Sequence, residues 1–273
     1  MQLTKRRITS FQNKLFVWWE SHKRDLPWRR TRDPYRILVS EVMLQQTQVS
    51  RVLPKYEEFL YYFPDVYALA RASSAKVLRV WKGMGYNRRA LYLKRTAEAV
   101  VRDFHGDFPQ DETELTQLPG LGIYTARALL VFAYEHDVAM IDTNIRQIIT
   151  HFFFQDKPQK EKVIQELADQ LLPKGKSWEW HQTLMDFGAL ELKRRKKMKR
   201  DVRIYAHPFR ESNRFYRGRI VDHLRERSSA ETVLMKILEK KYGKQASFFP
   251  PIIRGLIKDG LIVRSGARLH LPE

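Results

Sequence analysis

The stretch Leu118-Pro119-Gly120-Leu121-Gly122-Ile123-Tyr124-Thr125-Ala126-Arg127 decides the predicted fold. Residues 111–117 before it are predicted to form a short helix, and residues 126–134 after it a longer, almost wholly apolar one. Two glycines one residue apart, preceded by a proline, let the backbone turn sharply and approach another molecule closely. The amides of such a turn lack intrahelical partners, which suits an anion and above all a phosphate. An ordinary αα-hairpin with a glycine turn is the alternative interpretation.

Helical periodicity extends in both directions from this turn. Helices are predicted at 14–21, 34–46, 54–63, 66–72, 75–81, 88–104, 143–154, 159–172 and 177–190. A basic run at 193–200 marks a boundary, after which three helices are predicted at 214–227, 228–242 and 251–258, and a β-hairpin at 261–271. A capping box of Ser228 and Glu231 is expected to open the second of these three helices. The sequence therefore predicts a mainly α fold with a small winged-helix-like module at its C-terminal end.

The composition is strongly basic. Among 273 residues, 50 Lys and Arg outnumber 31 Asp and Glu, so the formal net charge is +19 and the pI about 10.1. A polyanionic partner is the leading inference. Charge alone does not separate nucleic acid from an anionic membrane, but the apolar runs are far too short to span a bilayer, and residues 1–10 do not read as a secretion signal. We expect a soluble, intracellular protein, cytoplasmic or nucleoid-associated, that binds no membrane.

The chain contains no cysteine. Disulfides, thiol nucleophiles, cysteine-based zinc sites and cysteine-ligated iron–sulfur clusters are therefore excluded. We expect no metal site and no cofactor.

Two carboxyl groups, those of Glu41 and Asp142, are candidates for a catalytic role. The helix at 34–46 is apolar almost all round, which predicts that it is buried and that Glu41 lies inside it or at the wall of a cleft. Burial of this kind raises the pKa of a carboxyl group. Asp142 directly precedes the helix at 143–154, where an Asp is an ordinary N-cap.

Motifs in register over roughly residues 14–190 closely resemble those of MutY-type adenine DNA glycosylases of the helix-hairpin-helix (HhH-GPD) superfamily. They are Leu26-Pro27-Trp28-Arg29, Asp33-Pro34-Tyr35, Val39-Ser40-Glu41-Val42-Met43-Leu44-Gln45-Gln46-Thr47-Gln48-Val49, Gly83-Met84-Gly85-Tyr86 with Arg88-Arg89-Ala90, and residues 118–127 with Ile141-Asp142-Thr143-Asn144. The family removes adenine mispaired with 8-oxoguanine or guanine from duplex DNA. The resemblance implies a two-lobed helical fold, with a six-helix barrel lobe at 28–135, a second lobe made of 1–27 and 136–205, and the C-terminal module at 206–273.

By position, Glu41 corresponds to the family's general acid, which protonates the adenine ring. Asp142 corresponds to the anion that stabilises an oxocarbenium-like sugar. Tyr124 stands where strand-cleaving relatives such as endonuclease III carry a Schiff-base lysine, so the resemblance implies a monofunctional enzyme. The structural alternatives are a Glu41 tied to a partner such as Arg29, and an Asp142 that only caps its helix.

The resemblance assigns supporting roles to further residues. Asn144 and Tyr124 match residues that support the acid and the anion through hydrogen bonds, although either residue could be a satisfied buried polar group. The predicted adenine pocket consists of Leu26, Arg29 and Val49, for which core packing is the alternative. The predicted DNA contacts are Gln45 and Gln46, which would wedge into the base stack, Tyr86, which would intercalate beside 8-oxoguanine, and Gly120, Gly122 and Thr125 of the hairpin.

The chain departs from the family in two places. The family's four-cysteine iron–sulfur segment begins after residues 186–189, with Leu192 near the first ligand position. The run that replaces it begins with Lys193, Arg194, Arg195, Lys196 and Lys197, which would attract DNA phosphates or form a solvated linker. The module at 214–271 stands in place of a Nudix-like domain, and its Arg254 and Arg264 would touch phosphates if it is more than a structural cap.

Three functions are compatible with these features. The first is a monomeric, monofunctional glycosylase acting on double-stranded DNA that contains a mispaired adenine. The second is a glycosylase for thymine or uracil opposite guanine, because relatives with Tyr124 and Asp142 act on those bases. The third is a catalytically silent protein that binds DNA structures through the hairpin. Glu41 with Gln45 and Gln46 favours the first.

Overall fold

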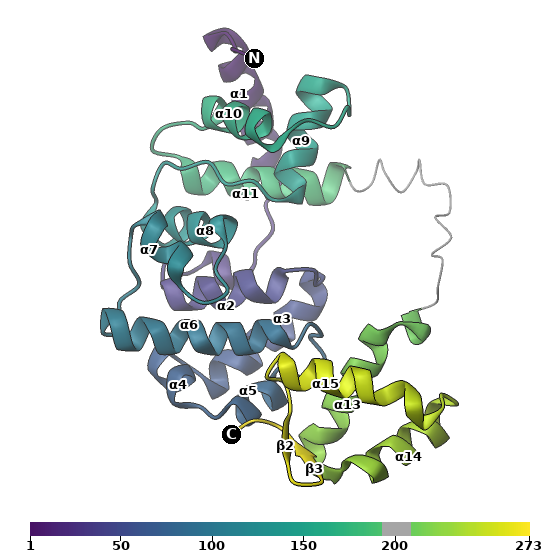
Figure 1. The fold of residues 1–273 in the computed structure, drawn as a ribbon. Coiled ribbons are helices and arrows are strands. Elements are labelled where there is room, and N and C mark those ends of the chain that lie inside the picture. Colours follow the sequence, from purple (N-terminus) through teal and green to yellow (C-terminus); the bar gives the residue numbers. More distant parts are fainter. Residues whose placement is uncertain (193–208) are drawn as a thin grey trace. The chain divides into compact units, whose positions relative to one another are not determined.

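The computed structural model describes residues 1–192 and 209–273, and these residues are mainly helical, as predicted (Figure 1). The elements before residue 193 are α1 (Lys5–His22), η1 (Pro27–Arg29), α2 (Pro34–Leu44), α3 (Val49–Tyr62), α4 (Val66–Arg71), α5 (Ser74–Val80), α6 (Arg88–Phe104), α7 (Glu112–Gln117), α8 (Ile123–Tyr134), α9 (Thr143–Phe154), α10 (Glu161–Leu171), α11 (Ser177–Phe187) and the π-helical turn η2 (Gly188–Leu192). The elements after residue 208 are η3 (Phe209–Glu211), α13 (Asn213–Glu226), β1 (Ser229–Ala230), α14 (Glu231–Tyr242), η4 (Ala246–Phe248), α15 (Phe249–Lys258), β2 (Val263–Ser265) and β3 (Arg268–His270).

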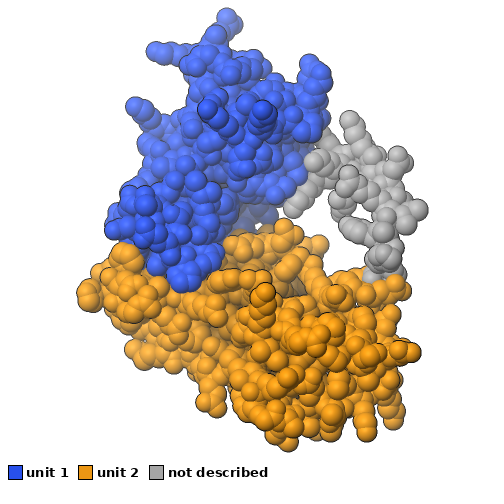
Figure 2. Space-filling view, in the orientation of Figure 1, with its two compact units in different colours: residues 1–41, 108–203 blue, residues 42–107, 204–273 orange. Residues whose placement is uncertain are grey.

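The elements group into two compact units, coloured blue and orange in Figure 2. Unit 1 consists of Met1–Glu41 and Phe108–Arg203, and unit 2 of Val42–Asp107 and Ile204–Glu273. The boundary falls within α2, so this helix contributes Glu41 to unit 1 and its last turn to unit 2. The three-part division expected from the sequence is a different grouping and stays a prediction. Within the described ranges, no helix is long and apolar enough to cross a membrane.

Unit 1 is built around a core of aliphatic and aromatic side chains from α1, α9, α10 and α11. Ile145, Ile148 and Ile149 recur at helical spacing on one face of α9, and all three are buried. The ring of Phe11 in α1 meets that of Trp180 in α11 edge-on, with centroids 6.1 Å apart. This core holds α9, and therefore the residues just before it, against α11.

Unit 2 combines α3 to α6 with the whole C-terminal module. Phe59 of α3 and Trp81 after α5 are fully buried, with ring centroids 5.8 Å apart. The module consists of α13, α14 and α15 and a three-stranded antiparallel sheet whose strands lie in the order β1-β3-β2. The hairpin of β2 and β3, with Arg264 opposite Leu269, is the one predicted from the sequence. The winged-helix-like expectation for this part is confirmed.

Four local predictions were wrong. Helix α3 begins at Val49 rather than at residue 54. The first helix begins at Lys5 rather than at residue 14, and the side chain of Thr4 caps its N-terminus. Helix α8 begins at Ile123 rather than at residue 126. The capping box before α14 does not form, because Ser229 and Ala230 pair with β3 as a strand, and no side chain caps the helix. A tertiary strand pairing therefore displaced a local cap.

Candidate active site

The turn at 118–122 joins α7 to α8 as a helix-hairpin-helix, as predicted. Gly120 has a φ of 82°, in the left-handed region that favours glycine. The amide of Leu121 closes the turn by donating to the carbonyl of Leu118 at 3.2 Å. Arg127 of α8 ties the two helices together, with its Nε 2.6 Å from Oε2 of Glu112. The hydrogen bond within the turn and the ion pair between α7 and α8 therefore fix the conformation of the turn.

Gly122 is the N-cap of α8 and has a φ of −96°, which any residue adopts. It is exposed, and a Cβ built there would meet no atom within 4 Å. The fold itself therefore does not require glycine here, and the open space suits the close approach of an outside group to the amides that begin α8. Thr125 is buried, so a DNA contact through its backbone amide, in the first turn of α8, stays a prediction.

Glu41 lies in the buried stretch of α2 and is 6 % exposed, as the apolar pattern of that helix predicted. Burial raises the pKa of its carboxyl group from an ordinary 4.5 to about 7, because the charged form loses hydration. A hydrogen bond from Tyr124 lowers this pKa in part, and the negative charge of Asp142 raises it further. A large fraction of Glu41 therefore holds a proton at neutral pH, as a general acid must.

Tyr124 comes from the first turn of α8, and its hydroxyl hydrogen-bonds to the Glu41 carboxyl group. Burial, followed by the nearby charges of Glu41 and Asp142, raises the pKa of this hydroxyl well above its ordinary value. Tyr124 is therefore a neutral donor throughout the physiological pH range. The structure brings Glu41, Tyr124 and Asp142 into one interacting group within unit 1.

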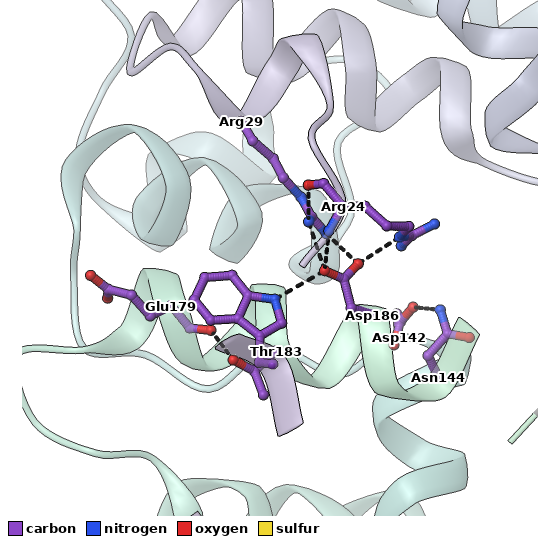
Figure 3. A network of polar contacts seen from close by, with 8 residues as sticks. Arg24, Arg29, Asp142, Asn144, Glu179, Thr183 and Asp186 are labelled. Atoms are coloured by element: carbon purple, nitrogen blue, oxygen red, sulfur yellow. Dashed lines mark hydrogen bonds and ion pairs between the residues drawn. The ribbon is translucent and has the colours of Figure 1, made fainter. Parts of the chain in front are cut away.

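Asp142 is the N-cap of α9, as predicted. Its Oδ1 accepts from the amide of Ile145 at 2.7 Å, and its Oδ2 from Nδ2 of Asn144 at 2.8 Å (Figure 3). These two donors, together with the positive end of the helix dipole, hold the carboxylate in one orientation. Gly188 packs against Asn144 with no room for a side chain, because a Cβ built on that glycine would lie 2.6 Å from Cβ of Asn144.

A polar network around Asp186 was missed by the sequence analysis (Figure 3). The buried carboxylate accepts two hydrogen bonds of 2.8 Å from Arg29, one of 2.6 Å from Nε of Arg24 and one of 3.0 Å from Trp19. Burial alone would raise the pKa of Asp186, but the hydrogen bonds and charges of Arg29 and Arg24 outweigh it and lower the pKa. In the sequence, the only trace of this network was the acidic Asp186 among the apolar residues Leu184, Met185 and Phe187 at the end of α11.

Leu26 and Arg29 belong to one short turn: Leu26 precedes η1, and Arg29 is its last residue. Leu26 is buried, and its carbonyl accepts from the amide of Arg29 at 2.9 Å. The Arg29 guanidinium is bonded to Asp186 and to the carbonyl of Arg24, and not to Glu41, so the tie between Glu41 and Arg29 considered above does not form. A role for Leu26 and Arg29 in an adenine pocket stays a prediction.

The residues present do not fit the iron–sulfur cluster of the resembled family. Leu192, near the first ligand position, is an aliphatic residue buried in the core of unit 1 beside Phe187. A cluster of that kind needs thiolates, and the chain has none. The basic residues predicted to replace it in DNA binding, Lys193, Arg194, Arg195, Lys196 and Lys197, lie outside the described residues.

The other predicted DNA contacts belong to unit 2. Gln45 and Gln46 follow α2, and Gln46 is exposed with a φ of 56°. Val49 is the first residue of α3 and is half-buried. Tyr86 lies between α5 and α6, is 38 % exposed and has a φ of 46°. Exposure of an aromatic ring on a loop is compatible with stacking on a base.

Arg89 of α6 links these two loops and was also missed. Its guanidinium donates at 2.6 Å to the carbonyl of Gln45, and at 2.6 and 3.0 Å to two carbonyls in the last turn of α2. It donates in addition to Oγ1 of Thr47 at 3.1 Å and to the carbonyl of Met84 at 3.2 Å. Burial lowers the pKa of Arg89 to about 10, which leaves it charged at neutral pH. Arg89 thereby satisfies carbonyls that the end of α2 leaves without partners.

The geometry of unit 1 offers one acid and one anion side by side. Glu41 can give a proton to a leaving group, while the oriented Asp142 can stabilise positive charge that develops as the bond breaks. Tyr124 holds the acid, and Asn144 the anion. The arrangement suits cleavage of a bond between a sugar and a basic leaving group.

Comparisons with known proteins find relatives among DNA glycosylases. A family model described as "HhH-GPD superfamily base excision DNA repair protein" matches residues 39–174. The chain is 39% identical over 179 residues to the adenine DNA glycosylase of Mycolicibacterium smegmatis, a match that covers 64% of this chain and 61% of that protein. It is 32% identical over 191 residues to the thymine/uracil-DNA glycosylase of Methanothermobacter thermautotrophicus, covering 68% of this chain and 86% of that protein. The solved structure of a thermostable thymine-DNA glycosylase matches at 31% identity with a TM-score of 0.65, covering 69% of this chain and 89% of that one.

Proposed function

The chain belongs to the HhH-GPD superfamily of base excision DNA repair proteins, and from that premise we propose that it is a monofunctional DNA glycosylase that excises adenine mispaired with 8-oxoguanine or guanine in duplex DNA. The observation that carries the proposal is the buried Glu41, whose pKa is raised to about 7, beside Tyr124 and Asp142. The chain spans only 61% of the Mycolicibacterium adenine DNA glycosylase, so this activity rests on the site more than on that likeness.

The proposed reaction uses the two carboxyl groups in opposite states. An N-glycosidic bond to a neutral purine breaks readily only if the base is protonated while positive charge accumulates on the sugar. Glu41 supplies the proton to the adenine ring, and Asp142 stabilises the sugar cation. Water then adds to the sugar carbon that held the base, and the proton it loses restores the acid form of Glu41. Tyr124 and Asn144 position the two groups.

The absence of a lyase step is part of the proposal. A strand-cleaving glycosylase of this fold needs an amine that forms a Schiff base with the sugar. Tyr124 occupies the expected position and offers a hydroxyl with a raised pKa, which is a poor nucleophile at neutral pH. The abasic product should therefore survive until alkali cleaves the strand.

The proposed partner is double-stranded DNA containing a mispaired adenine, bound by a monomer without a cofactor. The exposed Gly122 and the amides that open α8 would receive a phosphate, and Gln45, Gln46 and Tyr86 of unit 2 would enter the base stack. A net charge of +19 supplies the sequence-independent attraction. Such a substrate places the protein on intracellular DNA.

Thymine or uracil mispaired with guanine is the second candidate substrate. It is favoured by the Methanothermobacter relative, named a thymine/uracil-DNA glycosylase, of which the match covers 86%. Thymine and uracil can leave as anions and depend less on a proton donor than adenine does. The raised pKa of Glu41 therefore favours adenine.

Single-turnover base release from duplexes with A:8-oxoguanine, A:G, T:G and U:G pairs tests the proposal, each with and without alkali. Wild-type protein should release adenine and require alkali for strand scission, and Glu41→Gln should lose release while keeping duplex affinity. Glu20→Gln, which changes an exposed Glu of α1 in unit 1, is the matched control and should behave like wild type.

The outcomes separate the candidates. Full adenine release by Glu41→Gln would refute the role of the acid. Release of T or U without A would assign the pocket to pyrimidines. Duplex affinity without release of any base would leave a DNA-binding protein that has the fold of a glycosylase.

A further inference from the structure

The C-terminal module contacts three consecutive residues, the last two of the loop between α5 and α6 and the first of α6, all within unit 2. Arg214 of α13 lies on Tyr86. Arg225 of α13 donates to Oδ1 of Asn87 at 2.9 Å, and Asp259 after α15 lies 3.6 Å from Nη1 of Arg88. The module therefore contacts residues 86–88 through two arginines of α13 and through Asp259, the residue that follows α15.

The contact between Arg214 and Tyr86 is the closest cation–ring contact among the described residues. Cζ of Arg214 lies 3.6 Å from the centroid of the ring, and Nη1 donates a hydrogen bond to the hydroxyl. Both glycines before Tyr86 have positive φ angles, 91° at Gly83 and 67° at Gly85, and Tyr86 itself has 46°. The backbone of this loop is therefore bent to present the ring, and Arg214 fixes the ring once it is presented.

Arg214 is itself held by a rigid attachment of α13. Arg225, nearly buried, donates its Nε to the carbonyl of Leu78 at 2.8 Å, and Arg79 donates its Nε to the carbonyl of Arg225 at 3.1 Å. These bonds join α13 to α5 in both directions. An arginine on an anchored helix has lost freedom before any ligand arrives, so the ordering cost on binding is smaller.

Tyr86 is also adjacent to the amide-bearing loop after α2. Cζ of Arg89 lies 5.4 Å from the Tyr86 ring, and the same guanidinium bonds the carbonyl of Gln45. A partly exposed ring with two guanidinium groups next to it, linked through Arg89 to a loop of uncharged amides, has the composition of a platform on which a nucleic-acid base stacks. Such a platform combines a π-face with cations that attract the adjoining phosphates.

We propose that Arg214 is a positioning residue through which the C-terminal module holds Tyr86 ready to stack on a base of the bound duplex. The module is then a working part of the DNA-recognition surface rather than a cap on the fold. This inference rests on the proposed function for its substrate, duplex DNA with a mispair. In this proposal α13 contributes to DNA recognition through the contact of Arg214 with Tyr86 and not through a contact of its own with DNA.

A double-mutant cycle tests the inference on the full chain. The variants are Arg214→Ala, Arg214→Lys, Tyr86→Leu and the Arg214→Ala/Tyr86→Leu pair, with Lys240→Ala as the control for loss of one charge. Lys240 is an exposed lysine on α14 of the same module. The readouts are the Kd for a duplex with an A:8-oxoguanine pair, the single-turnover rate constant of adenine release at saturating protein, and the thermal unfolding temperature.

Arg214→Ala should weaken duplex binding roughly 3- to 30-fold, as expected for loss of a cation–π contact and its hydrogen bond. In the Tyr86→Leu background the same change should matter less than about twofold, because Arg214 acts through the ring. Arg214→Lys should recover part of the affinity, and all variants should unfold near the wild-type temperature. Lys240→Ala should produce a small loss that is the same in both backgrounds.

The inference is overturned if Arg214→Ala weakens binding equally with and without Tyr86, which would mean an independent phosphate contact, or if its loss of affinity matches that of Lys240→Ala. If the wild type binds the duplex but releases no base, the proposed function fails, and the affinity cycle still decides this inference. If the wild type binds no mispaired duplex, both are overturned. If adenine is released and the cycle shows no coupling, only this inference fails.

Discussion

Replacement of Glu41 by glutamine should change how stability depends on pH. In the unfolded chain the carboxyl group titrates at its ordinary 4.5, and in the folded chain burial raises its pKa to about 7. Between these values the folded chain holds a proton that the unfolded chain has lost, so the stabilisation is full below pH 4.5 and declines as the pH rises to 7. At about 1.4 kcal/mol per pKa unit, the decline amounts to about 3 kcal/mol.

Urea unfolding between pH 4.5 and 8 measures this decline as the difference between wild type and Glu41→Gln. The difference cancels the titration of all other groups, which both proteins share. Tryptophan fluorescence is a suitable probe, because every tryptophan except Trp81 belongs to unit 1. Glu41→Gln should gain about 3 kcal/mol relative to wild type over this range, whereas Glu20→Gln, altered at an exposed position, should follow wild type.

A flat difference, or a gain by wild type as the pH rises, would refute the reasoning. Either result would mean that Glu41 is ionised in the folded protein at low pH, as an ordinary paired carboxylate is. The base-release rate provides an independent check, because an acid whose pKa is about 7 should lose activity above that pH. A rate that keeps rising above pH 8 would exclude Glu41 as the proton donor.

Three further substitutions have defined outcomes. Tyr124→Phe removes a hydrogen bond that lowers the pKa of Glu41, so the alkaline decline in base release should move to higher pH. Gly188→Ala places a Cβ 2.6 Å from Cβ of Asn144, which should destabilise unit 1 by about 1–3 kcal/mol and slow base release without changing duplex affinity. Asp186→Asn leaves the nearly buried guanidinium of Arg29 and the partly exposed one of Arg24 without their carboxylate, and should cost about 3–5 kcal/mol in urea unfolding.

Gly188→Ala has a matched control, and each of the three substitutions has a result that would contradict it. Gly122→Ala is the partner of Gly188→Ala: its added methyl enters open space, so stability should be unchanged and only duplex affinity should fall. Equal destabilisation by both alanines would contradict the packing argument. A pH profile of Tyr124→Phe that moves to lower pH would show that its hydroxyl does not stabilise the ionised acid. A loss below about 1 kcal/mol for Asp186→Asn would mean that solvent reaches the network.

The parts of the site that could be predicted from sequence depend on local physics. Gly120 marks a turn because its positive φ strongly favours glycine, and the apolar surroundings of Glu41 in its own helix are enough to predict burial. Asp142 precedes a helix, which is enough to predict the cap that the structure contains. In each case the cause and the effect lie within a few residues of each other.

The parts that were missed depend on contacts between residues far apart in the chain. Asp186 bonds Arg29 across 157 residues, and Arg214 bonds Tyr86 across 128. No local pattern distinguishes these arginines among 50 basic residues. Ser229 shows the same effect on the fold, because its pairing with Leu269 overrode the local preference for a helix cap.

The two carboxyl groups of the site cannot be altered independently. The charge of Asp142 raises the pKa of Glu41, so Asp142→Asn removes the anion and at the same time lowers the pKa of the acid. At pH 8 the variant should lose activity for both reasons, whereas at pH 5.5 Glu41 is protonated in either protein and only loss of the anion counts. The ratio of wild-type to Asp142→Asn base-release rates should therefore be larger at pH 8 than at pH 5.5. A ratio that is constant with pH would mean that Asp142 acts on the sugar alone and that the proton affinity of Glu41 is set by burial and Tyr124.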